Sequence, residues 1–203
     1  MLEETVESSG VIEMMKQSGA LMTGHFELAS GLHSGEYIQC ALLLEDPVRA
    51  ETVGAQLGAL LRDSVAGLSP QVVISPAVGG LIIGHEVARA LGTRCIFAER
   101  VGGVMTLRRG FSIGDGERAV VVEDVFTTGG SIKEVMKVVT SSGGRVAAVA
   151  SVVNRGASVE FGVPTVSLVR AGIENHDPAE CPMCSRGVEV VKPGTKRTQM
   201  GSG

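Results

Sequence analysis

The chain has 203 residues, of which 44% are hydrophobic, 20% are charged and only 3% are aromatic. A chain of this length builds one domain, with room for a small addition, and it buries enough aliphatic surface for a core without disulfides or metals. Its 18 Lys and Arg against 22 Asp and Glu give a net charge of −4, which disfavours a nucleic-acid-binding protein.

The N-terminal residues predict no targeting segment. Met1–Glu7 contains three glutamates and no basic residue, which is the wrong charge for a secretory signal or a transit peptide. No apolar run approaches the ~18 residues that a membrane helix needs. Cys40 and Cys95 lie in apolar stretches, as buried hydrophobic cysteines do. We therefore expect a cytoplasmic, reducing location and no membrane partner.

The first part of the chain mixes helical and extended patterns. The expected elements are a short helix at 11–15 that ends by Gly19, strands at 24–31 and 36–40, and a helix from residue 47 onward. Asp46 and Pro47 have the order of residues that begins a helix, because Asp caps the free amides and Pro suits the first helical position.

Strands and helices alternate from residue 72 onward. Apolar strands are predicted at 72–75, 94–98, 119–122, 146–153 and 165–169, with helices at 81–91 and 132–140. Continuous apolar strands separated by helices indicate an α/β fold with a central, mostly parallel sheet flanked by helices. Residues 100–111 hold three arginines and three glycines and predict a long mobile loop or a hairpin. Ligands of such sheets bind at the carboxyl ends of the strands.

The strongest chemical motif follows the strand at 119–122. Two acids, Glu123 and Asp124, precede a turn of hydroxyl-bearing residues and glycine, Thr127–Ser131, which leads into a helix. Backbone amides at a helix N-terminus form a cradle for a phosphate monoester, and glycine leaves room for the phosphate. The acids would repel a phosphate but would hold sugar hydroxyls, so the motif favours a sugar phosphate. The alternative is a helix-capping turn with surface acids.

Residues 120–131 resemble the phosphoribosyl-diphosphate signature of the type I phosphoribosyltransferases. Further segments resemble the orotate branch of that family; they are 25–34, 75–80, 105–111, 153–156, 181–184 and 192–194. The resemblance implies the type I phosphoribosyltransferase fold, divided into a hood at 1–45, a core at 46–180 and a C-terminal hairpin or tail at 181–203. It also implies that ribose 5-phosphate is transferred from 5-phosphoribosyl 1-diphosphate to orotate, which yields orotidine 5′-monophosphate and diphosphate in pyrimidine biosynthesis.

The same resemblance implies a role for each matching position. Glu123 and Asp124 would contact the ribose hydroxyls, and Asp124 would also approach the charge that develops at the anomeric carbon. The 5-phosphate would bind Thr127, Thr128, Gly129, Gly130 and Ser131, and the diphosphate would bind Ala77, Val78, Gly79, Gly80 and Arg100. Arg155 would pair with the orotate carboxylate, because its planar fork matches that group. Thr127 and Tyr37 would lie beside the base, although Tyr37 is equally compatible with a core position.

The segment 101–111 matches the family's catalytic loop, which closes over the site of the neighbouring subunit and so implies a homodimer. Lysines of the family pattern are absent: Ala29 and Gly79 stand at two of their positions, and the loop has none. Arg108 and Arg109 are the expected substitutes, and they can neutralise diphosphate without readily yielding a proton. Mg²⁺, held mainly by the substrate, is the implied cofactor, with no protein side chain assigned to it.

Two other functions remain open at this point. The base could be a purine or another pyrimidine, but a purine lacks the carboxylate that Arg155 would pair with. The chain could instead sense phosphoribosyl diphosphate and regulate by binding nucleic acid, which its net charge of −4 disfavours.

Histidines and a cysteine pair lie outside this signature. The histidines are His25, His33, His85 and His176, and no two of them have the spacing of a helical metal pair. We expect His85 to be structural, and His25 and His33 to hydrogen-bond within their hairpin rather than to catalyse.

The Cys-X-X-Cys motif Cys181–Cys184 supplies half the ligands of a structural zinc site, and the others would come from elsewhere in the fold or from a partner chain. Two free thiols in a tail hairpin are the alternative. A redox role has no thioredoxin-like context.

Overall fold

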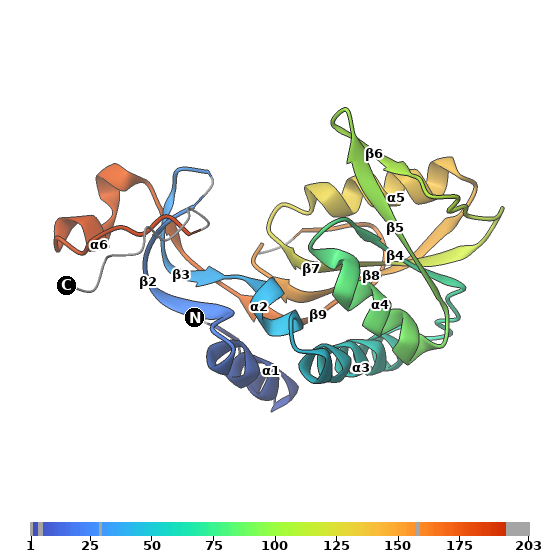
Figure 1. Cartoon of the computed structure of the whole chain (residues 1–203), viewed down its shortest axis with the longest axis horizontal. Coiled ribbons are helices and arrows are strands. Elements are labelled where there is room, and N and C mark those ends of the chain that lie inside the picture. The colour runs from blue at the N-terminus through green and yellow to red at the C-terminus, as the bar shows by residue number, and fades with distance from the viewer. Residues whose placement is uncertain (1, 4–5, 29, 157–158, 194–203) are drawn as a thin grey trace, which may run out of the picture.

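The chain forms two β-sheets in the computed structural model, which describes residues 2–3, 6–28, 30–156 and 159–193 (Figure 1). The seven-stranded sheet consists, in spatial order, of β1 (Leu2–Glu3), β9 (Thr165–Ala171), β8 (Arg145–Asn154), β7 (Arg118–Phe126), β4 (Val72–Pro76), β5 (Arg94–Val101) and β6 (Val104–Leu107). Strands β9, β8, β7, β4 and β5 run parallel to their neighbours, whereas β1 and β6 pair antiparallel at the edges. The predicted, mostly parallel sheet is confirmed.

Helices cover both faces of this sheet. One face carries α1 (Val6–Gln17), α2 (Cys40–Leu44), α3 (Pro47–Ser64) and α4 (Gly80–Leu91), and the other carries α5 (Gly130–Ser141). Asp46 caps α3 as predicted: its Oδ1 accepts hydrogen bonds from the amides of Val48 at 2.9 Å and Arg49 at 3.0 Å. No helix among the described residues combines the length and the apolar character needed to cross a membrane.

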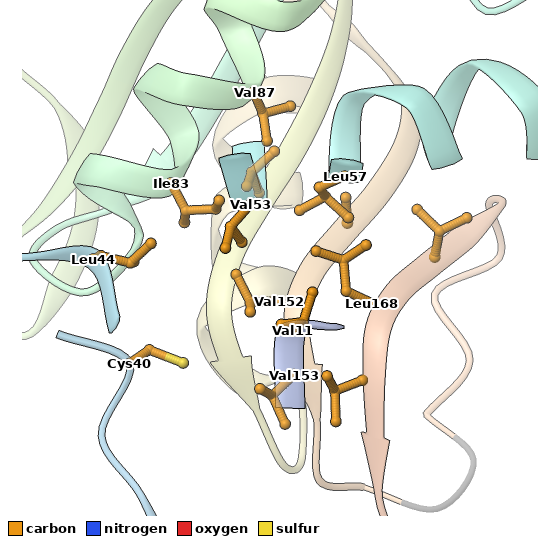
Figure 2. Close-up of a cluster of buried hydrophobic side chains, with 14 of the residues drawn as sticks. Val11, Cys40, Leu44, Val53, Leu57, Ile83, Val87, Val152, Val153 and Leu168 are labelled. Atoms are coloured by element: carbon orange, nitrogen blue, oxygen red, sulfur yellow. The ribbon is translucent and has the colours of Figure 1, made fainter. Parts of the chain in front are cut away.

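The core is aliphatic, as the composition predicts. Val53 and Leu57 of α3 pack with Ile83 of α4 and Val152 of β8, and all four are fully buried (Figure 2). Cys40 is buried in the same layer, where burial and the charges of the neighbouring acids raise the pKa of its thiol well above the usual value. A second hydrophobic cluster lies on the other face of the sheet, and α5 contributes three buried aliphatic side chains to it.

A second, three-stranded sheet lies beside the large one. It consists of β2 (Leu21–Glu27), β3 (His33–Ile38) and β10 (Asn175–His176), in the order β10-β3-β2. A short 3-10 helix (Pro178–Glu180) and α6 (Pro182–Ser185) follow. Farther along, the carbonyl of Val191 accepts a hydrogen bond from the amide of Glu27, and the amide of Val191 donates to the carbonyl of His25. The C-terminal segment therefore packs on the N-terminal hairpin (Figure 1).

The structure corrects the predicted strand bounds in this region. The strands begin earlier and end sooner than 24–31 and 36–40, and Cys40 begins α2 instead of ending a strand. The ladder itself is interrupted between Thr23 and Phe26, which hides the alternation on which a strand prediction depends. Ala29 and residues 194–203 lie outside the described residues.

The arginine-rich segment at 100–111 forms a hairpin. Strand β6 pairs antiparallel with the end of β5, and Gly102 and Gly103 make the turn with positive φ. Of the two predicted alternatives, the hairpin is the one that the structure contains. It projects from the edge of the large sheet (Figure 1).

Candidate active site

The two acids of the signature lie within strand β7 rather than after it. The prediction that this strand ends at Val122 is wrong, because its ladder with β8 continues through the pairs Glu123–Ser151 and Val125–Val153. Consecutive strand residues start toward opposite faces, but the carboxyl groups of Glu123 and Asp124 are close enough to hydrogen-bond with each other. Both lie at the carboxyl edge of the sheet, where parallel sheets bind ligands.

A pocket of about 250 Å³ opens where β7 meets α5. It is lined by Arg100, Glu123, Val125, Phe126, Thr127, Thr128, Gly129, Gly130, Ser131, Ile132 and Glu134. No side chain of the described residues caps the N-terminus of α5, so its first amides are available to an anion. The hydroxyl-bearing residues Thr127 and Thr128 are exposed beside them. The geometry is that of a phosphate cradle.

Glycine is required in this turn for two different reasons. Gly129 has a φ of +71°, and a Cβ there would lie 2.6 Å from the ring of Phe161, so the protein itself excludes a side chain. At Gly130 the nearest heavy atom to such a Cβ would be Thr128 Oγ1 at 3.8 Å, which is ordinary contact. Only a bound ligand would make a side chain at Gly130 unfavourable.

Glu123 is the most perturbed acid of the site. Only 7% of it is exposed, and burial, followed by the charge of Asp124 and a hydrogen bond with it, raises the pKa of Glu123 from 4.5 to about 9. With a pKa in this range, Glu123 is a neutral carboxylic acid at pH 7, which can donate a hydrogen bond as well as accept one. Strongly shifted carboxyl groups in a pocket are typical of functional sites.

The predicted diphosphate turn lies against the same acids. It connects β4 to α4, contains a cis peptide bond between Ala77 and Val78, and begins a helix without a side-chain cap. A Cβ on Gly79 would lie 2.8 Å from Asp124 Oδ1, and one on Gly80 would lie 3.2 Å from Glu123 Oε1. A larger residue at Gly79 would thus displace the Asp124 carboxylate.

The three predicted cationic residues are divided between the faces of the β5–β6 hairpin. Arg100 lines the phosphate pocket and pairs with Glu134 of α5, with Nη1–Oε2 at 2.7 Å. Arg108 and Arg109 instead lie near the carboxylate of Glu99, at 3.9 and 3.0 Å. Glu99 and Arg100 are consecutive and point to opposite faces. The structure therefore brings Arg100, but neither Arg108 nor Arg109, to this pocket of the same chain.

Arg155 follows β8 directly beside the phosphate turn. Its amide bonds to the carbonyl of Phe126 at 2.8 Å, while its Nε is buried and has no partner among the described residues. Burial lowers the pKa of Arg155, and the nearby Tyr37 and Glu36 of the hairpin oppose that change. An arginine remains charged despite such a shift, so its unsatisfied donor is suited to an anionic group.

Tyr37 takes part in two sets of contacts. Its ring lies 5.8 Å from that of Phe26, centroid to centroid, which is a packing contact within the small sheet. It also interacts electrostatically with Arg155, so the hairpin faces the end of β8. The partners Glu36, Glu99 and Glu134 were missed by the sequence reasoning, because no motif distinguishes them from other surface acids.

The remaining predicted residues lie elsewhere. His85 is exposed on α4, 3.5 Å from Glu86, and His176 pairs in register with His33. The expectation that His25 and His33 hydrogen-bond within their hairpin is confirmed, and the partner of each is the other, with Nε2 of His25 2.9 Å from Nδ1 of His33. Cys181 and Cys184 are free thiols, and they lie beside these two histidines on the small sheet.

Comparison with known proteins identifies the family to which the chain belongs. The phosphoribosyl transferase domain family matches residues 43–163. The orotate phosphoribosyltransferase of Heliobacterium modesticaldum is 50% identical over 187 residues, which cover 92% of this chain and 97% of that protein. The one from Pelotomaculum thermopropionicum is 49% identical over 188 residues, with the same coverage. The crystal structure of orotate phosphoribosyltransferase from Aeropyrum pernix covers 80% of this chain and 93% of its own, with 28% identity and a TM-score of 0.65.

These matches extend well beyond the signature at 120–131. They include the hairpin and the C-terminal segment, which lie outside the general phosphoribosyl transferase domain. The identity is therefore specific to the orotate branch and not only to the fold. The chain belongs to the orotate phosphoribosyltransferase family, whose members transfer the phosphoribosyl group to orotate.

Proposed function

We propose that this orotate phosphoribosyltransferase binds the 5-phosphate of 5-phosphoribosyl 1-diphosphate at Thr127–Ser131. The observation that carries the proposal is the uncapped N-terminus of α5, which opens into a polar pocket beside a buried acid. Free amides and the positive end of the helix dipole favour a doubly charged phosphate. The exposed hydroxyl groups of the turn add donors around the remaining phosphate oxygens.

The ribose would lie across the end of β7, with its hydroxyls on Glu123 and Asp124. A protonated Glu123 suits a hydroxyl because it can both donate and accept, whereas a second full charge would be repelled by the neighbouring acid. Asp124 would remain close to the anomeric carbon, where positive charge develops. The diphosphate would then extend toward the amides of Ala77–Gly80, a turn whose two glycines lie beside the carboxyl groups of Asp124 and Glu123.

Orotate would place its carboxylate on Arg155. The buried, unpartnered Nε is one of the donors in the guanidinium fork, and two parallel hydrogen bonds to a carboxylate would satisfy it. Tyr37 would border the pyrimidine from the hairpin, which acts as the hood of the site. A purine would leave this donor unsatisfied, at a cost of about 1–3 kcal/mol.

The chemistry needs charge stabilisation more than a strong base. The bond between the anomeric carbon and the diphosphate breaks, the deprotonated ring nitrogen of orotate forms the new bond, and diphosphate leaves with the electron pair. Arg100 would neutralise the departing group once it exchanges Glu134 for the ligand. Asp124 offers one carboxylate beside the diphosphate turn, which fits a Mg²⁺ bound mainly through substrate phosphates. When bound, Mg²⁺ adds charge neutralisation at the diphosphate.

The enzyme would act as a cytoplasmic homodimer. Arg108 and Arg109 lie on the opposite face of their hairpin from Arg100, so they are placed to serve a site other than their own. The hairpin projects from the edge of the sheet (Figure 1). Its residues Val101 and Val104 are exposed. A neighbouring subunit would receive the two arginines as additional cations for the diphosphate.

The experiment that tests these assignments separates the two substrates. Orotate consumption is followed by its ultraviolet absorbance, with Mg²⁺ present and each substrate varied in turn. Arg155→Ala is expected to raise the KM for orotate at least tenfold and to leave that for phosphoribosyl diphosphate nearly unchanged, because it removes one partner of a charge pair. Ser131→Ala is expected to have the opposite pattern. Equal effects on both substrates in both variants would contradict the assignment.

A further inference from the structure

Four metal-binding side chains converge on the small sheet, away from the phosphate pocket. His25 comes from β2, His33 from β3, and Cys181 and Cys184 from the segment around α6. One ligand atom from each, nitrogen or sulfur, lies within 4.8 Å of all the others. The chain thus brings together residues separated by more than a hundred positions, and no hydrogen-bonding need explains the choice of two thiols, which are weak donors and acceptors.

The distances match those between ligands of a tetrahedral zinc ion. Zinc bonds of 2.0–2.3 Å place two nitrogens about 3.3 Å apart, and a nitrogen and a sulfur about 3.6 Å apart. His25 Nε2 lies 3.5 Å from Cys181 Sγ and 3.7 Å from Cys184 Sγ, and His33 Nδ1 lies 3.3 Å from Cys184 Sγ. The two histidine nitrogens are 2.9 Å apart and all four ligand atoms lie within 4.8 Å of one another, so zinc would draw the two nitrogens apart and the widest pair together.

Contacts around the cluster orient its ligands as they do in structural metal sites. His25 Nδ1 donates to the carbonyl of Val188 at 2.8 Å, which leaves Nε2 as the nitrogen whose lone pair faces His33 Nδ1 and the two sulfurs. The amides of Met183 and Cys184 donate to the sulfur of Cys181, as expected around a thiolate in a tight Cys-X-X-Cys turn. These hydrogen bonds orient the side chains of His25 and Cys181, and none of them involves a residue of the phosphate pocket.

Burial indicates a closed site rather than a catalytic one. His25, His33 and Cys181 are 2%, 7% and 2% exposed, and only Cys184 reaches the surface. Four protein ligands leave no position for water or substrate, which is the pattern of structural zinc. Two thiolates and two imidazoles in a tetrahedral arrangement select zinc over the hard cations that prefer oxygen.

We propose that His25, His33, Cys181 and Cys184 bind one structural Zn²⁺ ion. The ion joins both strands of the hairpin to the C-terminal segment. Phe26 of the small sheet and Met183 of α6 are buried but belong to neither of the two core clusters, and small units with little core of their own need a metal or a disulfide for stability. Since the same hairpin carries Tyr37 and Glu36 to Arg155, zinc fixes the position of the hood without contacting substrate.

Metal analysis of the untagged protein tests this proposal. The protein is purified under reducing conditions without chelator, and its zinc content is measured by inductively coupled plasma mass spectrometry. We expect about one zinc ion per chain, and its loss in the double variant Cys181→Ser/Cys184→Ser. Cys95→Ser is the matched control: its thiol lies in β5, outside the cluster, and zinc content is expected to stay unchanged.

Cobalt provides a second readout that does not depend on a variant that folds. Reduced apoprotein titrated with Co²⁺ is expected to develop the visible bands of tetrahedral cobalt and a thiolate-to-metal band, both of which excess Zn²⁺ removes. Absence of these bands, together with zinc well below one per chain, would overturn the proposal. So would a wild-type mass that reveals a Cys181–Cys184 disulfide in freshly purified protein, or full zinc retention in the double variant.

Discussion

Glu123→Gln is expected to stabilise the folded protein, and to do so increasingly as the pH rises. The folded state holds the pKa of Glu123 at about 9, against 4.5 in its ordinary state. Below pH 4.5 the carboxyl is neutral in both folded and unfolded chains, so its ionisation does not lower the free energy of unfolding. Between pH 4.5 and 9 the unfolded chain releases the proton while the folded chain keeps it, and stability is lost progressively across that window.

The size of the effect follows from the same two values. Each tenfold difference in proton affinity corresponds to about 1.4 kcal/mol, so the penalty reaches about 3 kcal/mol at pH 7 and about 6 kcal/mol at pH 9. Glutamine has nearly the same shape and cannot ionise. The free energy of unfolding of the variant, minus that of the wild type, is therefore expected to grow by about 2–3 kcal/mol between pH 5 and pH 7.

Urea unfolding followed by far-ultraviolet circular dichroism measures this difference, since the chain has no Trp for a fluorescence assay. Comparison across pH 5, 7 and 8.5 cancels any constant effect of the new amide group. Glu51→Gln, which replaces an exposed carboxyl on α3, is the control and is expected to show little pH-dependent change. A difference between Glu123→Gln and wild type that is the same at every pH would refute the reasoning.

Three further predictions concern the turn, a cap and the hairpin. Gly129→Ala is expected to cost about 1–3 kcal/mol of stability, whereas Gly130→Ala, which has room, should raise the KM for phosphoribosyl diphosphate while leaving urea unfolding unchanged. Asp46→Ala should lower the free energy of unfolding by about 1 kcal/mol in the same assay and leave turnover unchanged. A slower turnover would mean that α3 contributes to the site. Mixing Arg109→Ala with Asp124→Asn should restore about a quarter of wild-type activity if the hairpin serves the partner's site, since half the dimers are mixed and each gains one intact site. No recovery would place Arg109 outside the partner's site.

The sequence predicts the large sheet well because its strands are read from local apolar runs. Strand β4 and helix α5 lie within a residue or two of the predicted positions, and α3 begins at the predicted residue. The end of β7 was misplaced because charged residues normally end a buried strand, yet here the ladder with β8 continues to the ligand-binding edge. The candidate site was predicted from one contiguous motif, which needs no tertiary information.

What the sequence does not predict depends on contacts between distant segments. Strand β10 has two residues and no pattern of its own; it exists because β3 offers it an edge. Cys181 and Cys184 indicate only half of a metal site, and nothing in the spacing of His25 and His33 marks them as its other half. The separation of Arg100 from Arg108 and Arg109 likewise depends on the hairpin register, which the loop prediction left open.

The joining of the chain's opposite ends in the small sheet has a consequence for biosynthesis. Residues 43–163 contain most of the large sheet, and they emerge from the ribosome before the segment that completes the hairpin does. The edge of β3 that β10 occupies, and the ring nitrogens of His25 and His33 that face the two sulfurs, therefore lack these partners until residues 175–184 have been synthesised. A chain truncated before Asn175 would retain the proposed phosphate cradle and the hairpin that carries Tyr37, but it would lack the segment that holds this hairpin in place, so the cradle is complete before the hood is fixed.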